Sequence, residues 1–191
     1  MPNLIDHLEG HMGLIDVGWK FHVEGETQAF QVARFRDTPV RGAVTFCTLG
    51  LSRFDTHAPV APGKRIQHEL IMSVPATLAE GPVPALLDQV AQQAIASGHA
   101  WLRGDVIGPA GPLFDGSSLE ALYVCNPVYF PDSFFVYSSP EGDIVLAWLV
   151  PISSREAAFV RSVGWKAFED HLARENPDLI DVWRTPMHLP L

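Results

Sequence analysis

The sequence predicts an α+β fold, in which a mainly antiparallel or mixed β-sheet is flanked by helices. Apolar and polar residues alternate with a period of two in several segments of the first 75 residues, which is typical of strands. Two later segments carry apolar residues at spacings of three and four, as one face of a helix does. The 15 glycines and 16 prolines provide turns between short elements. Together these patterns are typical of the α+β class.

The first half of the chain predicts one short helix and four strands. Leu4, Ile5 and Leu8 share one helix face, and the helix is expected to end near Gly10 or Gly13. Alternating or continuous apolar runs then predict an antiparallel meander, because the first two strands are separated only by the turn sequence GET. The four predicted strands cover residues 16–25, 28–36, 42–50 and 66–75.

The second half predicts two long helices and three strands. Pro84 suits a first helical turn, and the apolar spacing after it predicts a helix that extends to Leu102. Ser153 and Glu156 have the spacing of a capping box, which opens a second amphipathic helix that ends before Pro177. Between the helices, a loop with two Gly-Pro steps is expected at residues 108–118, and strands at 118–125, 132–139 and 142–150.

Length and charge restrict the classes of protein to which the chain can belong. Its 191 residues fit one domain, 1–191, because domains commonly have about 100 to 200 residues. The formal net charge is −9 and Lys and Arg do not cluster, which argues against a nucleic-acid partner. No segment has the ~20 apolar residues of a membrane-spanning helix, and no signal peptide begins the sequence, so we expect a cytoplasmic protein. The only two cysteines, Cys47 and Cys125, fit free thiols in a reducing compartment.

The stretch TLGLSRFD resembles part of a nucleophile turn. Gly50 and Ser52 have the spacing of the first two positions of G-x-S-x-G, but Phe54 stands where the second glycine is needed and no helix is expected to follow. A hydrolase or metal-dependent enzyme that uses Ser52 with His57 or His68 therefore remains only an alternative hypothesis, and it requires those side chains to converge.

Metal and cofactor motifs are incomplete. His7 and His11 bracket Glu9 on the first predicted helix, but HLEGH is neither H-E-x-x-H nor its inverse. The glycines near Lys64 and after Gly104 match neither a phosphate loop nor a dinucleotide fingerprint. We therefore predict no metal site, no cofactor and no catalytic residue.

Five stretches, in order, resemble the suppressor-of-fused domain family. The resemblance covers about residues 25 to 185, and its more specific parts are T-L-G-L-S and P-I-S-x-x-E. It implies a suppressor-of-fused-like α+β fold. The five stretches are VTFCTLGLS, HELIMSVP, WLRGDVIGPAGPLF, WLVPISSREAAFVRSVGWKAFEDHL and DLIDVWR.

The resemblance implies a non-enzymatic protein-binding module. The animal family member clamps a peptide of its partner between two halves. Because this chain has the length of the amino-terminal half alone, we do not expect it to bind the same partner. Stand-alone bacterial members have a similar length and are proposed to be immunity proteins that neutralise a secreted toxin. We therefore expect a protein partner, such as a toxin. A net charge of −9 would increase the rate at which a basic partner associates.

If a binding surface exists, the loop from Ser52 to Arg65 is the first candidate, because recognition is often placed on loops of a rigid sheet. Arg53 and Phe54 would supply an exposed charge and an aromatic anchor. A further alternative is a structural or oligomer-forming domain that uses the apolar tail VWRTPMHLPL as its contact surface.

Other residues of the family-like stretches are expected to have structural roles. Gly50 is a turn residue, and Glu156 is the capping partner of Ser153. Arg184 is expected to form an ion pair with a strand carboxylate such as Glu69.

Overall fold

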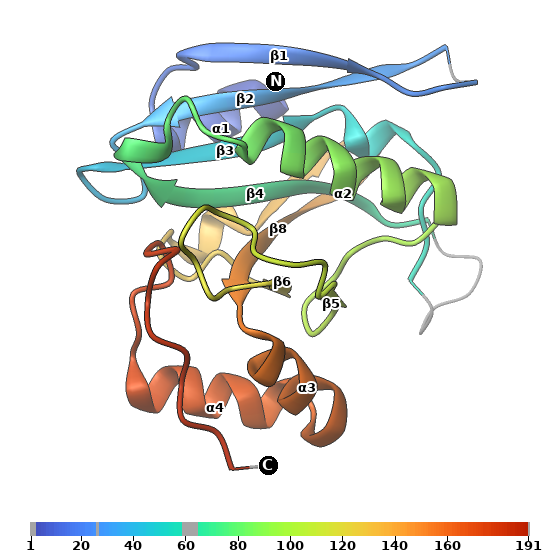
Figure 1. Cartoon of the computed structure of the whole chain (residues 1–191). Coiled ribbons are helices and arrows are strands. Elements are labelled where there is room, and N and C mark those ends of the chain that lie inside the picture. The colour runs from blue at the N-terminus through green and yellow to red at the C-terminus, as the bar shows by residue number, and fades with distance from the viewer. Residues whose placement is uncertain (1–2, 26, 59–64, 191) are drawn as a thin grey trace. The chain divides into compact units, whose positions relative to one another are not determined.

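The chain divides into two compact units in the computed structural model, which describes residues 3–25, 27–58 and 65–190. The first unit consists of residues 1–101 and 126–148, and the second of residues 102–125 and 149–191. Helices and strands are labelled in Figure 1. Among the described residues there are eight strands and four helices, so the predicted α+β class is confirmed.

The first unit is built on a meander of four antiparallel strands. In the sheet, β4 is followed by β8, which runs parallel to it, and β7 pairs with β8 antiparallel. The predicted meander is therefore confirmed, and the parallel pair makes the sheet mixed. The strands are β1 (Val17–His22), β2 (Ala29–Arg36), β3 (Ala43–Leu49), β4 (Gln67–Pro75), β7 (Val136–Ser139) and β8 (Gly142–Ile152).

One face of this meander is covered by α2 (Val83–Ser97), as Figure 1 shows. Alternate residues of a strand point to the same face of a sheet, so Phe30 and Val32 of β2 share one face, and both are fully buried. Pro84 lies in the first turn of α2 as predicted. The predicted end at Leu102 is wrong, because Gly98 adopts a left-handed conformation (φ +66°) and caps the helix after Ser97.

The helix α1 (Leu4–Met12) begins with a capping box that the sequence analysis did not predict. The Asn3 side chain accepts a hydrogen bond from the Asp6 N–H at 3.1 Å, and Asp6 accepts one from the Asn3 N–H at 2.8 Å. The helix ends at Gly13, one of the two predicted positions. It packs near β7 and the 3₁₀ turn η3 (Asp132–Phe134).

The second unit combines the end of β8 with two short strands and two helices. The strands β6 (Ala121–Cys125) and β5 (Val106–Ile107) follow the end of β8 in the sheet. The predicted single helix after Ser153 is wrong, because it is two helices, α3 (Ser154–Val163) and α4 (Trp165–Glu175). Gly164 separates them with φ +108°, a conformation that no helix can include.

The apolar tail packs within the second unit. Val182, Met187 and Leu189 are at most 5% exposed. These three side chains of the tail are therefore buried, whereas the Trp183 side chain is 44% exposed. These contacts do not favour the hypothesis that the tail is an oligomer surface.

Candidate functional site

The turn that ends β3 is built around the buried carboxylate of Glu69 on β4. The Oε1 atom of Glu69 accepts hydrogen bonds from the N–H of Gly50 at 2.9 Å and from the N–H and hydroxyl of Ser52 at 3.2 and 2.7 Å. Its Oε2 atom accepts from the Thr48 hydroxyl at 2.6 Å and the Leu51 N–H at 3.2 Å. One side chain thus satisfies three backbone N–H groups that the turn removes from the sheet.

Two opposing effects act on the ionisation of Glu69. Burial raises the pKa of its carboxyl above the usual value, because a charge is poorly solvated in the interior. The hydrogen bonds from Thr48, Ser52 and Gly50 oppose this increase, since they stabilise the ionised form. The Glu69 carboxyl group is therefore a structural acceptor enclosed by five donors.

This turn also fixes the position of Arg53. Gly50 has φ +103°, which favours glycine, and a Cβ atom added there would lie 3.2 Å from Nη2 of Arg53. The guanidinium therefore lies against Gly50, and a Cβ atom at position 50 would require it to shift. Arg53 itself is exposed to solvent.

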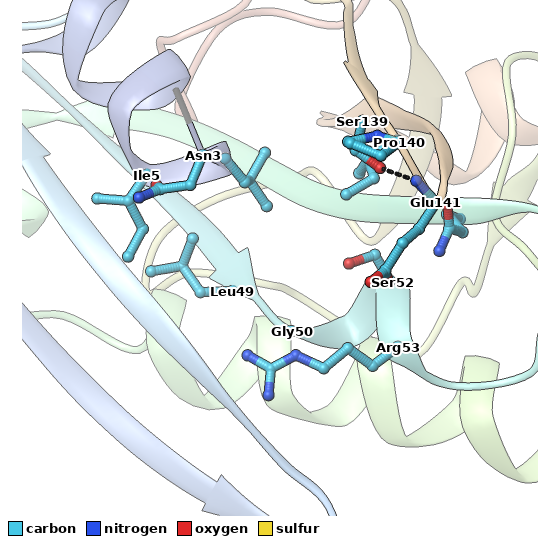
Figure 2. Close-up of a pocket in the computed structure, with 12 residues that line it drawn as sticks. Asn3, Ile5, Leu49, Gly50, Ser52, Arg53, Ser139, Pro140 and Glu141 are labelled. Atoms are coloured by element: carbon cyan, nitrogen blue, oxygen red, sulfur yellow. Dashed lines mark hydrogen bonds between the residues drawn. The ribbon is translucent and has the colours of Figure 1, made fainter. Parts of the chain in front are cut away.

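A pocket of about 430 Å³ opens beside this turn and is shown in Figure 2. We call it the Arg53 pocket. In Figure 2, Asn3, Ile5 and Leu49 lie on one side of it, and Ser139, Pro140 and Glu141 lie on the other. Its lining residues come from α1, the β3 turn, the start of β4 and the β7–β8 turn: Asn3, Leu4, Ile5, Leu49, Gly50, Ser52, Arg53, Gln67, Ser139, Pro140, Glu141 and Ile144.

A second hollow of about 390 Å³ shares Gln67 and Glu141 with the Arg53 pocket. Arg65 lines it and donates hydrogen bonds to the carbonyl oxygens of Ser52 at 3.0 Å and Arg53 at 2.9 Å. Because they share Gln67 and Glu141, the two hollows form one surface beside the beginning of β4 and β8. Its lining contains aliphatic side chains, two arginines and two carboxylates.

The four residues predicted for partner binding have different environments. Arg53 and Arg65 are exposed and line the two hollows, whereas Ser52 is only 6% exposed. The expectation of an exposed aromatic anchor at Phe54 is wrong, because this ring is 5% exposed and packs edge-on against Phe30 at 6.5 Å between centroids. Residues 59–64 of the predicted loop lie outside the described residues.

The three side chains of the hydrolase hypothesis have separate partners. Ser52 donates its hydroxyl to Glu69, and no hydrogen bond joins it to either histidine in the described part of the chain. His57 lies 3.6 Å from a carboxylate oxygen of Asp55, and His68 Nδ1 lies 3.4 Å from the Thr56 hydroxyl. The convergence that this hypothesis requires is not observed.

His7 and His11 pack against η3. The Nε2 atom of His7 lies 3.2 Å from the Phe134 carbonyl oxygen, and the His11 Nε2 atom lies 3.2 Å from the Ser133 hydroxyl. Burial lowers the pKa of His7, and the neighbouring His11 lowers it further. Among residues 3–25, 27–58 and 65–190, no group of three or more His, Cys, Asp or Glu side chains is arranged to hold a metal ion.

The second unit contains the other family-like motif. The predicted capping box is confirmed, since Ser153 accepts from the Glu156 N–H and Glu156 accepts from the Ser153 N–H. The Arg184 guanidinium pairs with both oxygens of Glu156, at 2.8 and 3.1 Å, and the Met187 N–H donates to the same carboxylate. The expectation that Arg184 pairs with Glu69 is therefore wrong, because each carboxylate is held by donors near it in its own unit.

Several residues of the Arg53 pocket were not predicted from the sequence. Ile5, Gln67 and Glu141 reach it from three different elements. The sequence signals at these positions indicate a helix, a strand and a turn, respectively, and do not indicate that the three elements meet. Only pairing of β4 with β8 brings the β7–β8 turn next to the β3 turn.

Solved structures similar to this chain have the same fold at low sequence identity. A SUFU (suppressor of fused protein) homologue from Neisseria gonorrhoeae FA 1090 has a TM-score of 0.76 and 17% identity, over 97% of this chain and 94% of its own. A chain of the Sufu–Fu complex has a TM-score of 0.72 and 15% identity, over 96% of this chain and 90% of its own. Drosophila Suppressor of Fused has a TM-score of 0.62 and 15% identity, over 82% of this chain and 42% of its own.

The family model for suppressor of fused protein (SUFU) matches residues 26–185, which is close to the extent of the resemblance seen in the sequence. No curated protein matches significantly. In the described part of the chain, no helix combines the length and apolar character needed to cross a membrane. Since the family model covers most of the 191 residues, this chain belongs to the suppressor of fused family.

Proposed function

We propose that this protein is a non-enzymatic protein-binding module, and that its partner is a secreted toxin that it neutralises as an immunity protein. The observation that supports it most is the surface formed by the Arg53 pocket and the neighbouring hollow. It presents exposed arginines and aliphatic side chains on a rigid turn, as binding surfaces often do.

The turn suits recognition because it is held in one conformation before a partner arrives. Five hydrogen bonds to Glu69 fix Gly50 and Ser52, and Arg65 donates to the two carbonyl groups that follow. A preorganised surface loses little conformational entropy on binding, which favours affinity.

Family membership supports a protein partner for this chain. The related fold occurs in the Sufu–Fu complex, and we extend protein binding from that complex to this chain. The net charge of −9 supports a basic partner, because complementary charge increases association rates. The proposal includes residence in the cytoplasm, where an immunity protein meets a toxin that has entered or has not been exported.

Hydrolysis is not favoured by the geometry of the site. The Ser52 hydroxyl is buried and donates to a carboxylate that already accepts four other hydrogen bonds. A serine nucleophile needs a general base with a free lone pair directed at its proton, and it needs open space through which a substrate can approach.

The test is coexpression with the protein encoded by the neighbouring gene, followed by size-exclusion chromatography with light scattering. We expect a stable complex, and we expect this chain to restore growth of cells that produce the neighbouring protein. Arg53→Glu should weaken the complex about tenfold or more, as loss of an interface arginine commonly does. Arg41→Glu, which changes another exposed arginine of the same unit, is the matched control. Failure of every coexpressed neighbour to form a complex, together with no protection of growth, would contradict the immunity function.

A further inference from the structure

We propose that the Arg53 pocket binds an extended segment of the protein partner in which one acidic side chain stands two residues from one aliphatic side chain. This inference rests on the proposed function and specifies the chemistry that the site recognises. The acidic group would pair with Arg53, and the aliphatic group would enter the apolar side of the pocket.

Arg53 has the geometry of a carboxylate receptor. Its guanidinium lies against Gly50, while other arginines of the chain, such as Arg34 and Arg184, have acidic partners at 2.5–2.8 Å. Within the described residues, no carboxylate lies within ion-pair distance of Arg53. A planar guanidinium pairs with a carboxylate through two parallel hydrogen bonds, so an unpaired and preplaced Arg53 matches that group best.

The wall beside Arg53 is aliphatic. Ile5 of α1 is 42% exposed, and Leu49 lies on the same side of the pocket (Figure 2). Covering these side chains removes apolar surface from water, which favours association. The aliphatic wall and the guanidinium share one pocket of about 430 Å³, so side chains two residues apart in one extended segment would reach both.

The surrounding charge makes this contact selective. The chain carries a net charge of −9, so an acidic side chain is repelled by most of the surface and is accepted where an unpaired arginine stands. Glu141 lines the other side of the same pocket and would repel a second acidic group. The pocket therefore fits one carboxylate, not a polyacidic segment.

Two adjoining hollows suit an extended polypeptide, because such a segment can place side chains in both. The neighbouring hollow shares Gln67 and Glu141 with the Arg53 pocket, so the two form one continuous lining beside the beginning of β4 and β8. An extended segment spans such a surface by directing alternate side chains into it.

The test uses short blocked peptides as probes and the amide NMR signals of Gly50, Ser52 and Ile5 as the readout. N-acetyl-Leu-Gly-Asp-amide should shift these signals in a saturable manner, and the matched N-acetyl-Leu-Gly-Asn-amide should bind at least about fivefold more weakly, because the charge-assisted pair is lost. Arg53→Gln should abolish the preference for the Asp peptide, and Arg41→Gln should keep it. Equal binding of the two peptides, or no shift at these three residues, would overturn the inference.

The outcome is separable from that of the proposed function. If the coexpressed partner still binds the Arg53→Gln variant with unchanged affinity, the protein remains a binding module and the Arg53 pocket is excluded as its contact site. If the Asp peptide binds selectively but no protein partner forms a complex, the pocket chemistry holds and the immunity function fails.

Discussion

Ser52 donates both its N–H and its hydroxyl to the same carboxylate oxygen of Glu69, at 3.2 and 2.7 Å. The hydroxyl that resembles a nucleophile in the sequence is therefore part of the structure that holds the β3 turn. The family-like stretch T-L-G-L-S has a clear physical role here, because the Glu69 carboxylate replaces the sheet as acceptor for three consecutive amides.

Glu69→Gln should destabilise the first unit by about 2–4 kcal/mol, because one acceptor oxygen becomes an NH₂ group that faces buried donors. Urea denaturation followed by tryptophan fluorescence measures the change. Glu24→Gln, at an exposed position, is the control and should change the stability by about 0.5 kcal/mol or less. An equal stability of the two variants would show that the carboxylate charge does not hold the turn.

In the second unit, weakening the ion pair between Glu156 and Arg184 should destabilise the protein to a similar extent. Arg184→Lys replaces a two-point contact with a single ammonium, so we expect a loss of about 2–4 kcal/mol. The exposed Arg174→Lys change on α4 should be nearly neutral. Hydrogen exchange at the Met187 amide, which donates to Glu156, gives a local readout; unchanged protection there in Arg184→Lys would contradict this role.

Acid should destabilise the protein through His68. Burial is the main reason that the pKa of this imidazole falls from 6.5 to about 4, and the nearby His99 lowers it further. The unfolded chain binds a proton at His68 near pH 6.5, whereas the folded chain does not until about pH 4. The contribution of His68 to the free energy of unfolding is therefore fully present above about pH 6.5 and is lost as the pH falls from about 6.5 to about 4. The full loss is about 3 kcal/mol for this group.

His68→Leu should remove this part of the pH dependence. Denaturation midpoints measured across the acid range should fall less steeply in the variant than in the unsubstituted protein. The exposed His22→Leu change is the control and should leave the slope unchanged. Parallel pH profiles for the His68 variant and the unsubstituted protein would exclude a depressed pKa.

Two glycine-to-alanine changes should act in opposite directions. Gly10 lies within α1, and a Cβ atom added there has no neighbour within 4 Å, so Gly10→Ala should stabilise the protein by about 0.5–1 kcal/mol. Gly164 has equally open space but φ +108°, so Gly164→Ala should destabilise it by about 1–2 kcal/mol. Thermal denaturation of both variants is the measurement, and the same sign for both would contradict the conformational explanation.

Local sequence signals predicted most of the elements. The period of two located the β1–β4 meander, and the Ser153–Glu156 spacing located the start of α3, because these signals depend on neighbours a few residues away. Errors occurred where backbone conformation overrides side-chain periodicity. Gly98 ends α2 before the apolar spacing does, and Gly164 divides a continuous apolar stripe into two helices.

By itself, the sequence determined the fold class, the family and the strand that carries Glu69, since these depend on local patterning and on the order of motifs. Only the tertiary structure decided that Phe54 is buried, that Arg184 pairs with Glu156, and that Ile5 and Glu141 meet Arg53 at one pocket. The physical reason is that exposure, ion pairing and pocket lining depend on which elements pack together. In this chain the parallel pairing of β4 with β8 joins segments more than seventy residues apart, and no local periodicity encodes that contact.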